Sequence, residues 1–332
     1  MTLQIGLLGC GRIGQVHARS IKALDGATLV AVADALPAAA QALARVTGAE
    51  VRDVDAILTA TDIDAVVICT PTDSHFDQII GAAKAGKAIF CEKPVDMSVE
   101  RIRACRDAVE GAGVTFLTGF NRRFDPNFAI LRARIKAGDI GAVELVSITS
   151  RDPAPPPVSY IERSGGLFRD MMIHDFDMAR FLMGEDFVRL HAVGSALVDP
   201  AIGAAGDVDT AAVILTTASG KICQISNSRR AAYGYDQRIE VHGVLGMLRA
   251  ENQLESTVEL ATKAGFRRDP AQHFFLERYE AAYLAEMRAF VEAVTGGIPA
   301  DPGIEDGLQA QILADAATRS RETGQPVDLP GA

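Results

Sequence analysis

Three glycines near the start of the chain and an aspartate further on have the spacing of a phosphate-binding turn. Gly9, Gly11 and Gly14 form a G-x-G-x-x-G pattern between a short apolar run and a helical stretch. In such turns the first glycine permits a tight bend, the second lets a pyrophosphate approach the backbone, and the third lets helix and strand pack closely. The free N–H groups at the start of the helix also attract phosphate. Because Asp34 stands about 20 residues later, where a ribose-binding acid belongs, the pattern predicts a dinucleotide cofactor.

Asp34 also bears on which dinucleotide is bound. Its carboxylate can accept hydrogen bonds from both hydroxyls of the adenine ribose, and it would repel a 2′-phosphate. The following segment, Ala35-Leu36-Pro37, supplies no arginine to offset that repulsion. NAD is therefore predicted in preference to NADP, although an aspartate at a strand end can also be an ordinary turn residue.

A lysine and an aspartate–histidine pair are the candidates for acid–base chemistry. Lys93 stands in the segment Cys91-Glu92-Lys93-Pro94, and Asp170 and His174 are separated by three residues. Residues at that spacing share one face of a helix, and histidine, with an ordinary pKa of about 6.5, suits proton transfer near neutral pH. An ammonium group can hold a substrate hydroxyl and stabilise alkoxide character as hydride leaves. The same residues could instead be a solvated lysine and a local polar pair.

Metal sites and disulfides are not indicated. Asp175 and Asp177 follow His174 closely and could suggest a metal site, but no second histidine or cysteine stands at ligand spacing, so no metal is predicted. The cysteines are odd in number and contain no C-x-x-C pair, which favours a reducing compartment; they are Cys10, Cys69, Cys91, Cys105 and Cys223.

Further candidate contacts surround these motifs. The cofactor is expected to contact, besides the three glycines and Asp34, a set of residues in the turn or after later strands: Arg12, Ile13, Thr70, Pro71, His75, Glu92, Lys93 and Asn121. Arg122 could be an ordinary basic residue at a strand end, or its guanidinium could donate to several hydroxyls. Tyr233 and Tyr235 could reach the substrate or serve packing. The predicted substrate contacts are Lys93, Arg122, Asp170, His174, Tyr233 and Tyr235.

The elements that would position these groups alternate over the first 120 residues. Short apolar runs are separated by helical stretches; the runs cover 3–8, 28–33, 65–69, 88–91 and 114–117, and the helices include 15–24, 37–47, 74–85 and 98–110. This alternation indicates a doubly wound parallel sheet with helices on both faces. Ligands bind beyond the carboxyl ends of such strands, which is where Gly9, Asp34, Thr70 and Lys93 fall.

The pattern changes after residue 142. Alternating or β-rich runs with turn residues between them indicate a mostly antiparallel sheet; they cover 143–150, 208–217, 221–228, 237–242 and 247–251. Helices are expected from Asp125-Pro126 to about Ala137, over 273–295 and over 304–323. The predicted fold class is therefore α/β followed by α+β, with a dinucleotide-binding Rossmann domain over 1–121 and a substrate-binding and oligomerisation domain over 122–332.

Charge and hydropathy exclude several classes of partner. The chain has 332 residues with a formal net charge of −10, and 48% of its residues are hydrophobic. So acidic a surface disfavours nucleic acid and anionic membranes. No apolar run reaches the roughly 18 residues of a membrane span, and Met1–Gly11 lacks the basic start of a signal peptide. We therefore expect a cytoplasmic protein.

Three motifs together resemble those of the glucose-fructose oxidoreductase/inositol dehydrogenase (Gfo/Idh/MocA) family. They are the glycine turn, the Glu92-Lys93-Pro94 segment, and the stretch Asp170–Asp177 that follows Gly165-Gly166. They occur in the order and spacing of that family. The segment 119–126, Gly-Phe-Asn-Arg-Arg-Phe-Asp-Pro, most resembles the inositol 2-dehydrogenase branch.

The resemblance implies an NAD-dependent dehydrogenase that oxidises a ring secondary alcohol, with myo-inositol to 2-keto-inositol favoured and scyllo-inositol, D-chiro-inositol or an aldose as alternatives. It implies that Lys93 contacts substrate and cofactor and that His174 is the general base, while Asp170 orients the imidazole or holds a neighbouring hydroxyl. Members of the family work without metal and commonly pair their sheets, which implies a homodimer or homotetramer. A non-catalytic NAD-binding sensor is the alternative from another class, since fold alone does not fix function.

Overall fold

The computed structural model describes residues 2–329, and the chain forms two compact units. Unit 1 comprises Met1–Phe124 and Ala281–Gln311, and unit 2 comprises Asp125–Glu280 and Ile312–Ala332. This division differs from the one expected from the sequence, because a late segment belongs to unit 1. The cause is burial: Met287, Phe290 and Val291 are part of the same hydrophobic core as the first strands of the chain. The boundary between residues 121 and 122 stays a prediction.

Unit 1 contains the predicted parallel sheet. Its strand order is β3-β2-β1-β4-β5-β6, and every neighbouring pair is parallel. The strands are β1 (Leu3–Leu8), β2 (Ala27–Ala33), β3 (Glu50–Val51), β4 (Ala65–Ile68), β5 (Ala88–Glu92) and β6 (Phe116–Gly119). Because β4 and β5 are buried along their whole length, they are apolar without alternation, except for Glu92 at the end of β5, as expected for strands covered on both faces.

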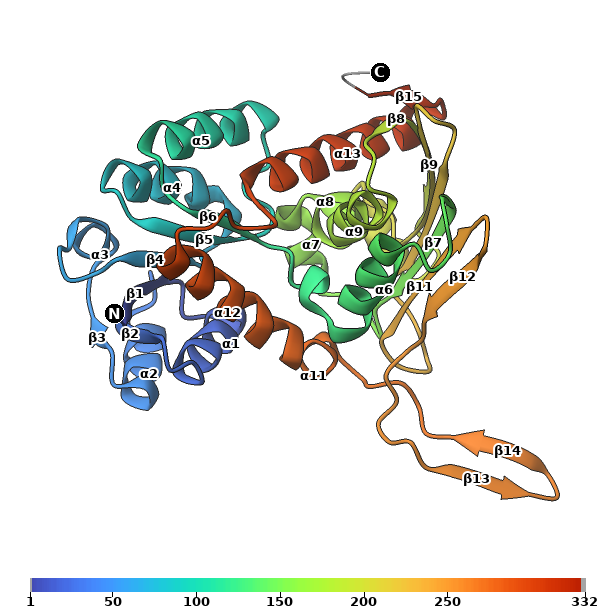
Figure 1. Ribbon diagram of the computed structural model, residues 1–332, viewed down its shortest axis with the longest axis horizontal. Helices are drawn as coiled ribbons and strands as arrows, with labels where there is room; N and C mark the ends of the chain where they lie inside the picture. Colours follow the sequence, from blue (N-terminus) through green and yellow to red (C-terminus); the bar gives the residue numbers. More distant parts are fainter. Residues whose placement is uncertain (1, 330–332) are drawn as a thin grey trace. The chain divides into compact units, whose positions relative to one another are not determined.

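Helices connect these strands (Figure 1): α1 (Arg12–Lys22), α2 (Pro37–Thr47), α3 (Val54–Thr59), α4 (His75–Lys84) and α5 (Val99–Ala112), with 3₁₀ turns η1 (Thr72–Ser74) and η2 (Asn121–Phe124). Their ends follow local chemistry. The Ser98 hydroxyl accepts a hydrogen bond from the Arg101 amide at 3.3 Å, capping α5. Gly113, with φ of 64°, ends the same helix, because glycine tolerates the left-handed region.

Unit 2 contains a seven-stranded sheet in the order β12-β11-β7-β10-β9-β8-β15. The pairings are antiparallel except that between β7 and β10. The strands are β7 (Val143–Arg151), β8 (Phe187–Ser195), β9 (Thr210–Thr217), β10 (Ile222–Ser228), β11 (Asp236–Gly243), β12 (Gly246–Ala250) and β15 (Val327–Asp328). Burial alternates along β7 and β9, so one face of the sheet is covered and the other is open.

The helices of unit 2 include α9, which contacts β7 and β10. They are α6 (Pro126–Ala137), α7 (Val158–Ser164), α8 (Gly166–Asp170), α9 (Ile173–Met183), α10 (Pro200–Ala204) and α11 (Phe275–Arg278). The expected start of α6 is confirmed, since the Asp125 carboxylate accepts hydrogen bonds from the amides of Asn127 and Phe128. A two-stranded hairpin, β13 (Glu259–Thr262) with β14 (Gly265–Arg268), extends away from the sheet of this unit (Figure 1).

Two predictions about the elements need correction. The last strand of unit 1 covers 116–119 rather than 114–117, because pairing with β5 sets Glu92 opposite Gly119. The helix expected over 273–295 is two helices, α11 and α12 (Glu280–Gly296), interrupted at Tyr279. The ring of Tyr279 packs edge to face against that of Tyr235. The other late helix, α13, covers Ile304–Thr323 as predicted. Within residues 2–329, no helix combines the length and the apolar character needed to cross a bilayer.

Candidate active site

The glycine-rich turn after β1 has the shape that a pyrophosphate requires. Gly9 has φ of 95°, and a Cβ atom there would lie 2.5 Å from the carbonyl of Cys69. A Cβ atom on Gly14 would lie 1.9 Å from the Gly9 carbonyl oxygen. Around Gly11, in contrast, no heavy atom of the described chain lies within 4 Å of that position. Because α1 also begins there without a side-chain cap, phosphate oxygens beside Gly11 can accept hydrogen bonds from amides at the start of this helix.

Asp34 is held beside this turn at the end of β2. One carboxylate oxygen accepts a hydrogen bond from the Cys10 amide at 2.6 Å, and the other accepts from the Leu36 amide at 2.7 Å. These bonds fix the direction of the carboxylate, and each oxygen keeps capacity for another donor. The side chain is half-buried, so ribose hydroxyls can reach it.

The segments after β4 and β5 are joined by a buried histidine. In His75, Nε2 lies 2.9 Å from the Thr70 carbonyl oxygen and Nδ1 lies 3.0 Å from that of Pro94. Burial lowers the pKa of His75, and this effect is larger than the rise caused by the two carbonyls. The ring thus ties two loops together, while Pro71 between them is exposed. A direct contact of His75 with cofactor stays a prediction.

Glu92 faces inward at the end of β5. One of its carboxylate oxygens lies 2.7 Å from Nε2 of His17, a fully buried residue of α1, and the other accepts a hydrogen bond from the Lys93 amide at 3.2 Å. The pair therefore connects the helix of the glycine turn to the backbone of Lys93, whose side chain is partly exposed. The sequence analysis assigned Glu92 to the cofactor and gave no role to His17, since a lone histidine in a helix carries no signal of its partner.

The turn after β6 contains Asn121 and Arg122, which were predicted to contact cofactor and substrate, and Arg123, which was not. Asn121 is 3% exposed, and its side-chain nitrogen has no hydrogen-bond partner within residues 2–329. Such a donor calls for a ligand or water, because an unpaired buried amide is costly. Arg122 is also buried. Arg123 pairs with Asp301 at 2.6 Å and Asp306 at 2.7 Å within unit 1, which gives it a structural role.

The carboxyl ends of five strands thus supply the predicted cofactor residues of unit 1. Pairing places Leu8, Ala33 and Ile68 opposite one another at this edge. The open position at Gly11, the uncapped start of α1, the Asp34 carboxylate and the unpartnered Asn121 amide all fit a dinucleotide. Arg12 and Ile13 lie in the first turn of α1, where their amides point the same way.

Asp170 and His174 belong to unit 2, and they do not share one continuous helix as expected. Asp170 is the last residue of α8, and His174 lies in the first turn of α9. The amides of Met171 and Met172 both bond to the Leu167 carbonyl, which closes α8. A turn therefore separates Asp170 from His174, and the expectation that they share one face of a helix does not hold.

Asp170 is clamped between two donors. The Tyr160 hydroxyl donates to one carboxylate oxygen at 2.9 Å, and Nη2 of Arg229 lies 3.3 Å from the other. Arg229 is 1% exposed, whereas Tyr160 is 49% exposed. The sequence analysis missed Arg229. The available signal was its place directly after a predicted strand, the same signal that singled out Arg122.

The two other acidic residues of the motif are fully buried in α9. Asn227 donates its amide to Asp175 at 2.9 Å, and Asp177 is likewise inaccessible to solvent. In the part of the chain that the structure describes, no three metal-ligating side chains gather in one place. Asp175 thus acts within the packing of α9 against β10.

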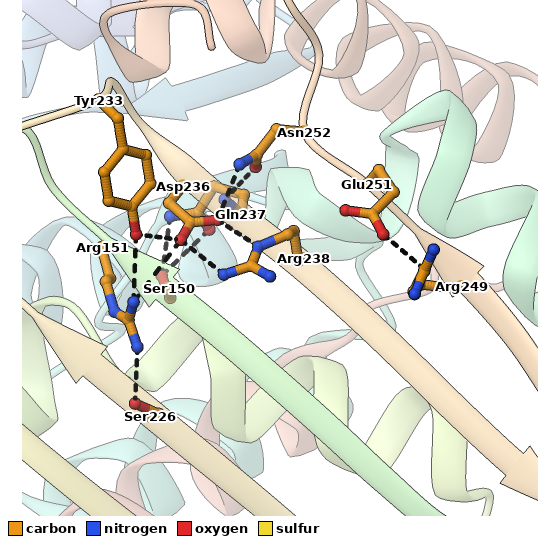
Figure 2. A network of polar contacts seen from close by, with 10 residues as sticks. All are labelled: Ser150, Arg151, Ser226, Tyr233, Asp236, Gln237, Arg238, Arg249, Glu251 and Asn252. Carbon is orange, nitrogen blue, oxygen red and sulfur yellow. Dashed lines mark hydrogen bonds and ion pairs between the residues drawn. The ribbon is translucent and has the colours of Figure 1, made fainter. Parts of the chain in front are cut away.

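Tyr233 belongs to a polar network on unit 2 (Figure 2). Its hydroxyl donates to Asp236 at 2.7 Å and accepts from Arg151 at 3.1 Å. Asp236 is fully buried and also accepts from Arg238 and Asn252. Burial alone would raise the pKa of Asp236, but these hydrogen bonds lower it. The Tyr233 phenol is thus fixed by protein groups, although half its surface is exposed.

Tyr235, two residues on, is buried. Its ring meets that of Tyr279 edge to face at 5.9 Å, and the Tyr279 hydroxyl donates to Gln237 at 3.2 Å. This placement supports the packing alternative for Tyr235. Its contact with substrate stays a prediction, as does that of Tyr233.

Comparison with known proteins agrees with this geometry. Residues 3–120 match the oxidoreductase family with an NAD-binding Rossmann fold, and residues 132–329 match the C-terminal alpha/beta domain of the same family. The chain belongs to the Gfo/Idh/MocA oxidoreductase family. Its first 120 residues therefore form an NAD-binding domain, as the glycine turn and Asp34 predicted.

Individual relatives match over nearly their whole length. The chain is 58% identical to an inositol 2-dehydrogenase of Rhizobium meliloti over 96% of this chain and 97% of that protein. A myo-inositol dehydrogenase structure from Corynebacterium glutamicum has a TM-score of 0.96 at 43% identity, with both chains covered completely. A scyllo-inositol dehydrogenase from Lactobacillus casei, solved with NAD(H) and scyllo-inositol, has a TM-score of 0.93 at 32% identity over 99% of each chain.

Proposed function

We propose that this protein is an inositol 2-dehydrogenase that oxidises myo-inositol to 2-keto-inositol with NAD. The observation that carries the proposal is the 58% identity to the Rhizobium meliloti inositol 2-dehydrogenase across both chains. The cofactor site in unit 1 supports it, because an open glycine turn and a ribose-binding acid suit NAD.

The proposed chemistry uses a small set of residues. The glycine turn and Asp34 would hold NAD, which would supply the acceptor for the hydride of the alcohol carbon. His174 removes the hydroxyl proton, since imidazole is matched to proton transfer near neutral pH. The Lys93 ammonium donates a hydrogen bond to the reacting oxygen and stabilises the charge that develops there. Asp170 orients the imidazole or a neighbouring hydroxyl.

Further residues are proposed to recognise the substrate. Arg122, Tyr233 and Tyr235 are proposed as additional contacts, because guanidinium and phenol groups suit a ring with many hydroxyls. Scyllo-inositol is the second candidate substrate, since the Lactobacillus casei relative is a scyllo-inositol dehydrogenase with the same fold.

The open face of the unit 2 sheet supports a proposal of self-association. Apolar side chains are exposed there, among them Val193 on β8, Ile214 on β9 and Ile222 on β10. Exposed apolar side chains on an open sheet face suit association with another protein surface. We assign a homodimer or homotetramer on this basis. A cytoplasmic location stays an expectation from the sequence.

The deciding test follows NADH absorbance with purified protein, NAD and each of myo-inositol, scyllo-inositol, D-chiro-inositol and several aldoses. The proposal expects a clear rate with myo-inositol and a weaker one with NADP. His174→Ala and Lys93→Ala should abolish turnover while NAD still binds. Full activity in both variants would overturn the assigned chemistry, and a rate with another polyol alone would change the substrate.

Asp34 provides a separate test of cofactor choice. Asp34→Ala removes both the ribose acceptor and the repulsion of a 2′-phosphate. The ratio of kcat/KM for NAD to that for NADP should therefore fall. An unchanged ratio would contradict the role of Asp34.

A further inference from the structure

Arg229 is among the largest fully buried side chains of the described chain, and it stands at the end of a strand. It directly follows β10, and its backbone amide donates to the Asp209 carbonyl oxygen at 2.8 Å. Asp209 is itself fully buried and accepts hydrogen bonds from the amides of Leu197, Val198 and Asp199. The backbone of Arg229 is thus held by Asp209, which is itself fixed by hydrogen bonds from a loop.

A guanidinium in such a place needs an anion. Taking its charge out of water is strongly unfavourable unless a counter-ion and hydrogen bonds compensate. The carboxylate beside it is that of Asp170, whose oxygen lies 3.3 Å from Nη2. Nε of Arg229 is also buried and has no hydrogen-bond partner within residues 2–329. Asp170 is therefore the group that makes the buried charge tolerable.

The arrangement also fixes how Asp170 lies. Arg229 holds one carboxylate oxygen from the buried side, and the Tyr160 hydroxyl holds the other from the exposed side. Two donors on opposite oxygens restrict rotation about the bond to the carboxylate carbon. Asp170 ends α8, and the turn after it leads within four residues to His174. The direction of this carboxylate is thus set just before the proposed base.

We infer that Arg229 is a positioning residue for the proposed reaction: it holds the carboxylate of Asp170 in one direction, so that Asp170 can orient His174 or a substrate hydroxyl. This inference rests on the proposed function. Arg229 does not itself contact substrate in this assignment. Its removal should slow turnover by releasing Asp170, and it should leave NAD binding in unit 1 unchanged.

The test combines truncation with chemical rescue. Arg229→Ala opens a space that guanidinium ion, at a low and non-denaturing concentration, can fill beside Asp170. The inference expects kcat with myo-inositol to fall on the order of 10- to 100-fold, as when partners that orient functional side chains are removed. The Kd for NAD should stay the same. Added guanidinium should restore part of kcat in this variant and have no such effect on the wild type.

Arg169 supplies a matched control. It is the chain neighbour of Asp170 on α8, but its guanidinium pairs with Asp315 at 2.7 Å. Arg169→Ala should keep kcat within about twofold of the wild type and show no rescue, since it leaves the clamp on Asp170 intact. If Arg169→Ala loses as much activity as Arg229→Ala, or if guanidinium rescues neither, Arg229 is only a packing residue and the inference is overturned.

A conservative variant covers the case in which Arg229→Ala does not fold. Arg229→Lys keeps the charge, but its shorter side chain cannot place a donor where Nη2 of Arg229 lies beside the Asp170 oxygen. It should fold with a Tm near that of the wild type and show a lowered kcat with an unchanged NAD Kd. Wild-type kcat in a folded Arg229→Lys would contradict the inference alone. An inactive wild-type protein that still binds NAD would instead contradict the proposed function.

Discussion

The carbonyl oxygen of Gly9 occupies the space in which a Cβ atom on residue 14 would stand. The two atoms would be 1.9 Å apart, so Gly14→Ala must push α1 away from β1. Gly11 differs, because the described chain leaves the corresponding position open. We expect Gly14→Ala to destabilise the protein by about 1–3 kcal/mol, as overpacking does. Gly11→Ala should leave Tm unchanged and weaken NAD binding on the order of tenfold, since its methyl group would meet the pyrophosphate.

Thermal unfolding and calorimetric titration with NAD separate the two variants. Equal NAD affinity in Gly11→Ala and the wild type would contradict the placement of the pyrophosphate. An unchanged Tm in Gly14→Ala would contradict the close packing of α1 on the turn.

The buried pair of His17 and Glu92 leads to a second prediction. His17→Phe keeps a ring against Phe90 and Tyr283, which lie 4.7 and 5.7 Å from the His17 ring centroid, but it leaves a Glu92 oxygen without its partner. An unsatisfied buried polar group costs about 1–3 kcal/mol. We therefore expect urea unfolding of His17→Phe at a lower midpoint than the wild type.

The matched control for this pair is the double variant His17→Phe/Glu92→Met. It removes both polar partners, so part of the lost stability should return. A double variant no more stable than His17→Phe would show that the ring packing, and not the pair, matters. NAD affinity measured on the same proteins tests the remaining prediction that Glu92 serves the cofactor.

The parallel sheet and its ligand edge could be predicted from the sequence because the signal is local. Runs such as Ala65–Ile68 are apolar without interruption, and turn residues such as Asp34 and Thr70 follow them directly. Once the strands are parallel, their carboxyl ends must meet at one edge. The glycine turn needed no tertiary information either, since its conformation is encoded in three residues.

The parts that escaped prediction depend on contacts between distant segments. Arg229 reaches Asp170 across 59 positions of the chain, and no spacing rule connects a strand end to a helix end. The helix is also interrupted at Tyr279, whose ring packs against that of Tyr235, and this contact joins residues 44 positions apart in the chain. Asp170 and His174 looked like one helical face, yet hydrogen bonds to Leu167 end the helix between them.

The cysteines give a prediction about reactivity. Within residues 2–329 all five thiols are free, and four of them are buried. Burial raises the pKa of Cys10 to about 12, helped by Asp34, and raises the pKa of Cys105 to about 12 as well. At about pH 8 the thiolate fraction is then on the order of one in ten thousand. Titration with a disulfide reagent should be slow in the native protein and rapid for five thiols after denaturation. A fast stoichiometric reaction of Cys10 in the native state would contradict its burial.

His75 gives a prediction about stability against pH. Burial lowers its folded-state pKa below the ordinary value, although the carbonyls of Thr70 and Pro94 oppose the shift. The unfolded chain therefore binds a proton more readily than the folded one, so the contribution of His75 is present above about pH 6.5 and is lost as pH falls below it. Between about pH 7 and pH 5, urea unfolding should show a steeper loss of stability for the wild type than for His75→Gln, because the other acid-sensitive groups are common to both proteins. Equal slopes for the two proteins would mean that the ring does not stay neutral between its two carbonyls.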